Sequence, residues 1–154
     1  MTNKTIYIGC DNAGFALKEA VLSVIHDLSL NYVDIGVNSA SDGTYYPLIA
    51  EKLCKAMQAS ETPAQGILLC GTGIGMAMTA NKFEGIFAAV CHDNYSAERA
   101  RLSNDGNVLC MGARVIGSEL AKKIAREWLT LTFKDGSSTP KVAEMRRIDR
   151  EHHK

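Results

Sequence analysis

Gly66-Ile67-Leu68-Leu69-Cys70-Gly71-Thr72-Gly73-Ile74-Gly75 is the stretch that decides the fold of this chain. Its short apolar run, residues 67–69, is typical of a buried parallel strand. The run ends in Cys70, and three glycines at alternating positions lead into a predicted helix over residues 76–82. Glycines allow successive backbone N–H groups to point into one concavity, and the helix adds the positive end of its dipole. The stretch therefore predicts a strand, a tight turn and a helix, with an anion-binding loop at the turn.

Cys70 allows two interpretations. A thiol at the rim of an anion-binding loop has its thiolate form favoured, which places a base or nucleophile beside an oxyanion site. A cysteine at the end of a strand is also commonly a small buried apolar side chain. Nucleotide binding is disfavoured: the dinucleotide fingerprint needs glycine where Met76 stands, and residues 74–76 lack the Gly-Lys-Ser/Thr ending of a P-loop. The loop suits a small anion better than a nucleotide.

Length and charge place the chain among ordinary globular proteins. Its 154 residues suit a single domain over residues 1–154. Lys plus Arg equals Asp plus Glu, 17 each, which argues against a nucleic-acid partner held by bulk charge. No apolar run reaches the length that spans a membrane, so we expect a soluble, cytoplasmic protein. The five cysteines are odd in number and form no Cys-x-x-Cys pair, which favours reduced, buried thiols and no zinc site.

Apolar runs and helical periodicities alternate along the chain. We predict strands over residues 6–10, 32–36, 67–69, 86–91 and 107–111, and helices over residues 15–28, 47–57, 76–82, 94–102, 117–133 and 140–151. This alternation predicts an α/β fold with a parallel sheet covered on both faces. Ligands of such sheets bind beyond the carboxyl ends of the strands. The polar groups expected at that edge are residues 10–12, 70–75, 91–93 and 111–114.

Several polar residues have more than one interpretation. Asp11 follows a strand and precedes a helix, so it suits both an N-cap and a ligand contact. We interpret His92 as a solvated loop histidine, and Arg114 as either an anion contact or half of a surface ion pair. Arg99 and Arg101 are expected on the solvated flank of a helix. His26, His152 and His153 have no second cluster of ligand spacing, so no metal site is predicted.

The chain resembles the family of type B ribose-5-phosphate isomerases and galactose-6-phosphate isomerase subunits. Matching stretches follow the family's order along nearly the whole chain: residues 9–14, Tyr46-Pro47, residues 70–75, 80–82 and 95–97, Asn104-Asp105, Asn107-Val108 and residues 112–117. The resemblance implies a Rossmann-like three-layer α/β/α sandwich with a five-stranded parallel sheet. It also implies a homodimer or dimer of dimers with shared active sites, in which the C-terminal helix packs on the partner subunit.

The activity that the resemblance implies is cofactor-free aldose–ketose isomerisation of a phosphorylated sugar through a cis-enediol(ate). It gives the proton transfer to Cys70, with Asp11 and Thr72 binding sugar hydroxyls or assisting proton movement between oxygens. Backbone N–H groups of residues 71–75 would hold the enediolate oxygen. The residues assigned to substrate binding are Asn12, Tyr46, Gly71, Gly73, Ile74, Gly75, Ser103, Asn104, Arg114 and Lys141.

Departures from the family pattern concern the substrate. Asn12 stands where the family commonly has His, and Ser103 stands where relatives that act on ring sugars carry the His assigned to ring opening. Ser137 and Lys141 stand where two arginines are expected. A four-carbon sugar 4-phosphate cannot close a furanose ring through its phosphorylated hydroxyl, and it needs no ring opener. Residues 95–100 followed by Leu-Ser-Asn at 102–104 resemble tetrulose-phosphate isomerases, which makes a tetrose or tetrulose 4-phosphate a candidate substrate.

Two other classes of function remain open. A non-catalytic or regulatory subunit would keep the fold and bind sugar phosphate, but it would have no need of Cys70. A nucleotide-binding module is disfavoured by the failed fingerprints.

Overall fold

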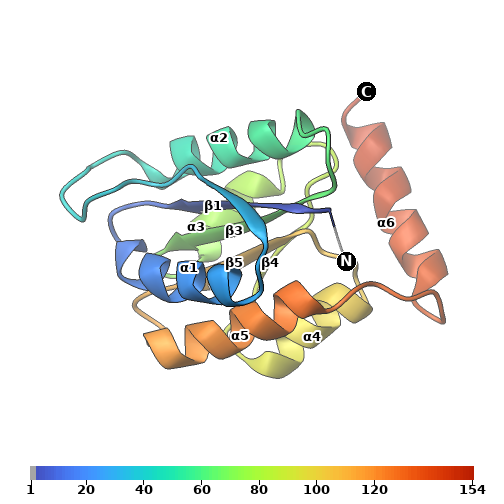
Figure 1. Ribbon diagram of the computed structural model, residues 1–154. Coiled ribbons are helices and arrows are strands. Elements are labelled where there is room, and N and C mark those ends of the chain that lie inside the picture. Colours follow the sequence, from blue (N-terminus) through green and yellow to red (C-terminus); the bar gives the residue numbers. More distant parts are fainter. Residues whose placement is uncertain (1–2) are drawn as a thin grey trace.

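The computed structural model describes residues 3–154 and contains one parallel sheet of five strands in the order β2-β1-β3-β5-β4. Figure 1 shows the sheet between two layers of helices. The strands are β1 (Thr5–Cys10), β2 (Asn31–Asp34), β3 (Ala64–Cys70), β4 (Ala88–Val90) and β5 (Val108–Gly112). The predicted three-layer α/β fold is therefore confirmed.

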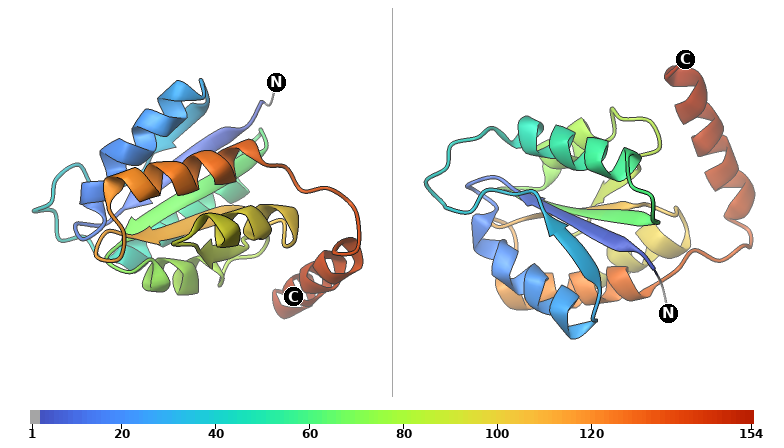
Figure 2. Two further views of the ribbon diagram at one scale, coloured as in Figure 1. Left: turned by 90° about the horizontal axis from the view of Figure 1, so that it is seen from below. Right: turned by 45° about the horizontal axis from the view of Figure 1, so that its top comes forward.

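Helices cover both faces of the sheet. The α-helices are α1 (Lys18–Asp27), α2 (Tyr46–Gln58), α3 (Ile74–Ala80), α4 (Asn94–Leu102), α5 (Ser118–Thr130) and α6 (Thr139–His152). Helices α2 and α3 pack together on one face, whereas α1, α4 and α5 form the layer on the other (Figures 1 and 2). Helix α6 follows a connection that leaves the end of α5 and belongs to neither layer (Figures 1 and 2); it contacts the rest of the chain through Asp149, which accepts the N–H of Gly85, and through Arg146, which pairs with Asp105.

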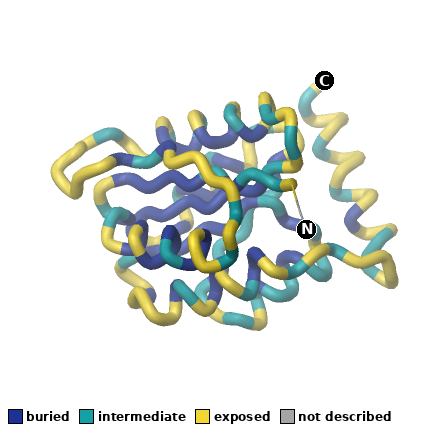
Figure 3. The backbone as a smooth tube through the Cα atoms, in the orientation of Figure 1, coloured by how far each residue is buried: buried dark blue, intermediate teal, exposed yellow. Residues whose placement is uncertain are grey.

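The core follows the central strands. Residues 65–70 of β3 are buried, as expected for a strand covered on both faces, whereas all four residues of the edge strand β2 are exposed. Figure 3 shows the buried tube running through the middle of the sheet and the exposed tube along α6. Trp128 of α5 is fully buried and is the largest side chain of this core.

Each predicted strand and helix is present, and the bounds differ at several places, including the following three. The first predicted helix begins as a short 3₁₀ turn, Phe15–Leu17, before α1. The fourth predicted strand shortens to β4 because the N–H of Phe87 bonds to Asn107 Oδ1. The helix predicted to reach residue 133 ends at Thr130, where Lys4 Nζ donates to the carbonyl of Leu129 at 2.7 Å.

Arg101 is not on a solvated flank, which corrects the sequence interpretation. Its side chain is buried at the end of α4, where it pairs with Asp105 and donates to the carbonyl of Gly106. Its guanidinium also lies 5.6 Å from the centre of the Trp128 ring. A buried guanidinium needs such partners, so Arg101 joins α4 to α5 and to the turn that leads into β5.

Candidate functional site

The carboxyl ends of β1 and β3 lie side by side, because the two strands pair in parallel, and the strand order reverses between them. Such a switch point is where open α/β sheets bind their ligands. The N–H of Asp11, just after β1, bonds to the carbonyl of Leu69 in β3 at 3.2 Å. The end of β5 lies on the other side of β3, with Gly112 paired to Cys70. The polar loops predicted for this edge are therefore brought together.

Cys70 ends β3 and is 5% exposed. Its Sγ accepts the backbone N–H of Gly73 at 3.0 Å. This contact needs the chain to reverse within three residues, and Gly73 does so with a φ of +79°, a conformation that L side chains rarely adopt. Helix α3 begins at the next residue. The predicted sequence of strand, glycine turn and helix is confirmed, and the turn wraps around the sulfur.

The side chains of Thr72 and Tyr46 complete the surface of this turn. Thr72 is exposed, and its Oγ1 accepts the N–H of Ile74 at 3.2 Å. The ring of Tyr46, from the first residue of α2, packs on Gly75: a Cβ atom there would lie 2.4 Å from the ring. Gly75 thus admits an aromatic side chain next to the turn.

Asp11 is buried, and its side chain closes a turn and does not cap a helix: the residues that precede the 3₁₀ turn and α1 are Gly14 and Leu17. Its Oδ1 accepts the N–H of Gly14 at 2.9 Å, which caps the turn that follows β1. The same side chain lies at the strand end that pairs with the end of β3. Asn12, the next residue, is exposed at this edge.

Arg114 brings a positive charge to the glycine turn. Its backbone N–H donates to the carbonyl of Gly71 at 3.0 Å, and its guanidinium lies against the same glycine: a Cβ atom on Gly71 would lie 3.0 Å from Nη1. Arg114 is exposed. A guanidinium beside a loop of backbone N–H groups is suited to a phosphate or another oxyanion.

His92 is not a solvated loop histidine, which corrects the sequence interpretation. It is half-buried after β4, and its Nε2 accepts the N–H of Gly112 at 2.8 Å. Burial lowers the pKa of His92, so the imidazole is neutral at pH 7 with its proton on Nδ1. The bond fixes the end of β5, and a Cβ atom on Gly112 would lie 2.5 Å from the backbone of Thr72. His92 therefore holds the end of β5 against the glycine turn. No sequence motif indicated this role.

The other four cysteines behave differently from Cys70. All five are free and buried, as the sequence predicted. The thiols of Cys10, Cys54 and Cys91 each donate to a backbone carbonyl. Burial raises the pKa of Cys10 and Cys91 to about 11, that of Cys54 to about 12, and that of Cys110 well above its ordinary value. These four thiols are protonated packing groups, whereas the sulfur of Cys70 receives an N–H.

Ser103, Asn104 and Lys141 do not join this group within one chain. Helix α4 starts beyond the carboxyl end of β4 and returns along the sheet, so Ser103 and Asn104 lie near the opposite edge, ahead of β5. Lys141 is exposed on α6, which lies outside the two helix layers in Figure 2. Three of the sequence-predicted binding residues thus face surroundings other than their own Cys70.

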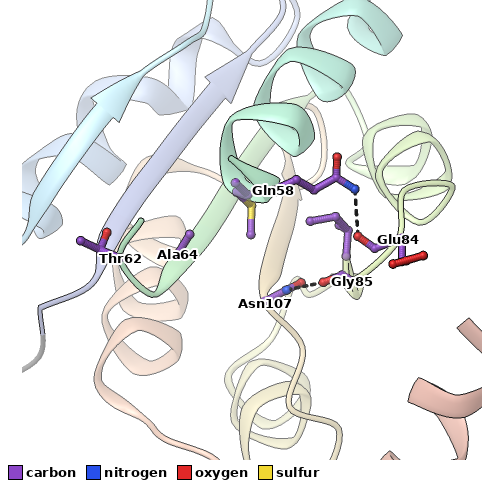
Figure 4. A pocket seen from close by; sticks show the side chains of 8 residues that line it. Gln58, Thr62, Ala64, Glu84, Gly85 and Asn107 are labelled. Carbon is purple, nitrogen blue, oxygen red and sulfur yellow. Dashed lines mark hydrogen bonds between the residues drawn. The ribbon is translucent and has the colours of Figure 1, made fainter. Parts of the chain in front are cut away.

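The hollow drawn in Figure 4 also lies at the opposite edge. It is a depression of about 470 Å³ beside the start of β3. Its amide side chains are used by the fold: Gln58 Nε2 donates to the carbonyl of Glu84 at 2.9 Å, and Asn107 Nδ2 donates to that of Gly85 at 2.8 Å. Because backbone carbonyls already accept from these donors, the amide groups of the hollow are not free to orient a reacting sugar.

Two kinds of feature are absent from residues 3–154. Within this range, no cluster of three or more His, Cys, Asp or Glu side chains has the arrangement of a metal site. None of the helices there combines the length and the apolar character that crossing a membrane requires.

Comparisons with known proteins agree with the geometry. The sequence profile described as ribose/galactose isomerase matches residues 6–145. A Listeria innocua protein named ribose-5-P isomerase B is 44% identical over 96% of this chain and 98% of its own length. A Pectobacterium atrosepticum protein named D-erythrulose-4-phosphate isomerase is 45% identical over 92% of each chain. The solved structure of Clostridium thermocellum ribose-5-phosphate isomerase B superposes with a TM-score of 0.88 at 34% identity, covering 96% of this chain and 99% of that one.

Proposed function

Since the chain belongs to the ribose/galactose isomerase family and is a sugar-phosphate aldose–ketose isomerase, we propose that it works without a cofactor, uses Cys70 as its base, and prefers a four-carbon sugar 4-phosphate. The contact between Cys70 Sγ and the N–H of Gly73 at 3.0 Å carries the assignment of the base. An N–H donated to sulfur stabilises a thiolate, and the thiols of Cys10, Cys54 and Cys91 instead donate to carbonyls.

The reaction needs one base that serves two neighbouring carbons. The Cys70 thiolate takes the proton from the carbon beside the substrate's carbonyl, and electrons move to the carbonyl oxygen to give a cis-enediolate. The resulting thiol returns the proton to the neighbouring carbon, which converts aldose to ketose. General base catalysis of this kind typically contributes roughly 10²–10⁴-fold to a rate.

The remaining groups of the loop serve the oxygens of the substrate. Backbone N–H groups of residues 71–75 hold the developing enediolate oxygen, apart from those of Gly73 and Ile74, which donate to Cys70 Sγ and Thr72 Oγ1. Asp11 and Thr72 bind hydroxyls and assist the proton movement between oxygens. Arg114, which lies against Gly71, helps to hold the phosphate.

Each site is completed by a second copy of the chain in a homodimer or a dimer of dimers. The separation of Ser103, Asn104 and Lys141 from their own Cys70 supports this arrangement, because these groups are then free to face the Cys70 loop of a partner. Exposed apolar side chains beside the loop, Ile74 and Met78 of α3, also suit burial against another copy. In this assembly α6 packs on the partner subunit. We further propose that residues 1–154 act as one isomerase domain in the cytoplasm.

We expect the protein to run as a dimer or a larger oligomer at micromolar concentration in multi-angle light scattering. The physical reason is that a monomer would lack Ser103, Asn104 and Lys141 at its Cys70 loop and would expose the apolar surface of α3. A folded monomer with full isomerase activity would contradict the shared site.

We expect a higher kcat/KM for D-erythrulose or D-erythrose 4-phosphate than for D-ribose 5-phosphate. Ser103 is a poor general acid at neutral pH, so opening the ribose ring limits turnover of the pentose but not of the open-chain tetrose. Ser103→His is expected to raise kcat/KM for ribose 5-phosphate by roughly tenfold or more, with a smaller gain or a loss for the tetrose. Ser103→Ala, which adds no acid, is the matched control. Equal or better use of ribose 5-phosphate by the wild type, without a gain from the histidine, would end the ring-opening argument.

An isomerase assay across tetrose, pentose and hexose phosphates tests the proposed function. Turnover of at least one of them, with the tetrose preferred, is the expected result. Binding of sugar phosphate without any turnover would instead favour a non-catalytic or regulatory subunit.

A further inference from the structure

Arg99 and Ser103 form a pair on the surface of α4 that the sequence did not predict. Arg99 Nη1 donates to Ser103 Oγ at 3.1 Å, one helical turn apart. The carbonyl of Arg99 also accepts the N–H of Asn104 at 3.2 Å. The guanidinium is thus bonded to Ser103, and the backbone of Arg99 is bonded to Asn104; the proposed function gives both of these residues to the partner subunit's site.

The charge of Arg99 is only weakly neutralised. Its Nε lies 3.2 Å from Glu98 Oε2, but this N–H does not point at the carboxylate, and Nε is a buried atom with no hydrogen-bond partner among the described residues. Neighbouring residues on a helix do not face each other. Both side chains are about two-fifths exposed, at 40% and 38%, and such pairs contribute little. Arg99 therefore keeps a positive charge and N–H donors for a further anion.

The Arg99–Ser103 pair has the chemistry of a phosphate contact. A guanidinium binds phosphate oxygens through two parallel N–H donors. Ser103 Oγ accepts from Arg99, which leaves its own hydroxyl proton to be donated to a second oxygen. A serine held in this way is a hydrogen-bond donor and not a proton source at pH 7.

Sugar chemistry explains why a phosphate contact belongs at this position. In a ribofuranose 5-phosphate, O4 is the ring oxygen, which a ring-opening acid must protonate. In a tetrose 4-phosphate, O4 is the ester oxygen that carries the phosphate. We compare the two sugars with their reacting carbons in the same position beside the base. A protein residue that lies next to O4 of the pentose then lies next to the phosphate of the tetrose.

We propose that Arg99 and Ser103 bind the phosphate of a four-carbon substrate in the partner subunit's site, and that Arg99 determines the preference for this substrate. This inference rests on the proposed function, because that function places Ser103 opposite the partner's Cys70 loop. The inference assigns to the site a cation, Arg99, that the family resemblance did not assign. This cation lies close to O4, where a shorter sugar carries its phosphate.

Arg99→Met, which keeps the length of the side chain and removes its charge, tests the proposal. We expect the KM for D-erythrose 4-phosphate and the Kd for inorganic phosphate, measured by calorimetry, each to rise roughly 10- to 100-fold, the value of a charge-assisted hydrogen bond. The kcat should change less than about threefold, and the KM for ribose 5-phosphate should rise less than that for the tetrose. Arg99→Lys, which keeps the charge but not the paired donors, should fall between the wild type and Arg99→Met.

Arg126→Met is the matched control, since Arg126 pairs with Asp27 on the distant surface of α1 and α5. It should leave all four quantities unchanged. Unchanged phosphate Kd and tetrose KM in a folded Arg99→Met would overturn the proposal. So would a loss confined to kcat, because it would show that Arg99 only positions Ser103. If the wild type turned over no sugar phosphate, the proposed function would be refuted. Calorimetry with inorganic phosphate would still show whether Arg99 binds phosphate.

Discussion

Cys70→Ser is expected to lower kcat by roughly 10³-fold, with the KM and the fold retained. The expected loss follows from the chemistry of the side chain: serine is nearly isosteric with cysteine, but its hydroxyl is a far weaker acid, so at neutral pH it offers almost no anion to take the proton. The N–H of Gly73 keeps an acceptor in Ser Oγ, so the glycine turn should not collapse. Steady-state kinetics with the best substrate of the isomerase panel measures the effect, and the melting temperature reports the fold.

Cys54→Ser provides the control for this experiment. Cys54 is a buried thiol of α2 that donates to the carbonyl of Ala80, and burial raises its pKa to about 12. The same exchange there should cost some stability and leave kcat close to that of the wild type. If Cys70→Ser behaved in the same way, with some stability lost and the rate kept, then Cys70 would be a packing residue and the assignment of the base would be wrong.

Gly14→Ala is expected to lower the free energy of unfolding by about 3 kcal/mol or more and to reduce isomerase activity in the protein that still folds. A Cβ atom at residue 14 would lie 2.2 Å from the carbonyl oxygen of Leu69 and 2.6 Å from the backbone nitrogen of Cys70. Both are backbone atoms of the central strand, so they cannot move aside as a side-chain end would. The loop after β1 must retreat, which takes Asp11 away from the end of β3.

Gly43→Ala is the matched control, because no atom lies within 4 Å of the Cβ position at residue 43. The exchange there should change the free energy of unfolding by less than about 1 kcal/mol. Urea unfolding followed by circular dichroism compares the two variants with the wild type. Equal midpoints for Gly14→Ala and the wild type would show that the loop after β1 does not make the close contact with the end of β3 described above.

The sequence predicted the elements and their arrangement because these depend on local patterns. The buried run of β3, the glycines after it and the alternation of strands with helices are readable from neighbouring residues alone. Parallel strands place their carboxyl ends at one edge, so the meeting of the Asp11 and Cys70 loops followed from the order of elements. The bounds were less exact where a distant group ends an element, as Lys4 does at Leu129 and Asn107 does at Phe87.

Only the tertiary structure distinguished among residues of one chemical type. All five cysteines are buried, yet the direction of a single N–H separates Cys70 from the thiols that donate to carbonyls. His92 and Arg101 were expected in solvent, but His92 is half-buried and bonded to Gly112, and Arg101 is buried against Trp128. Ser103 and Asn104 were predicted to bind the same substrate as Cys70, and the path of α4 places them at the opposite edge. Periodicity records which face of an element is buried, but hydrogen-bond partners depend on where segments far apart in the chain meet, and that is determined by packing.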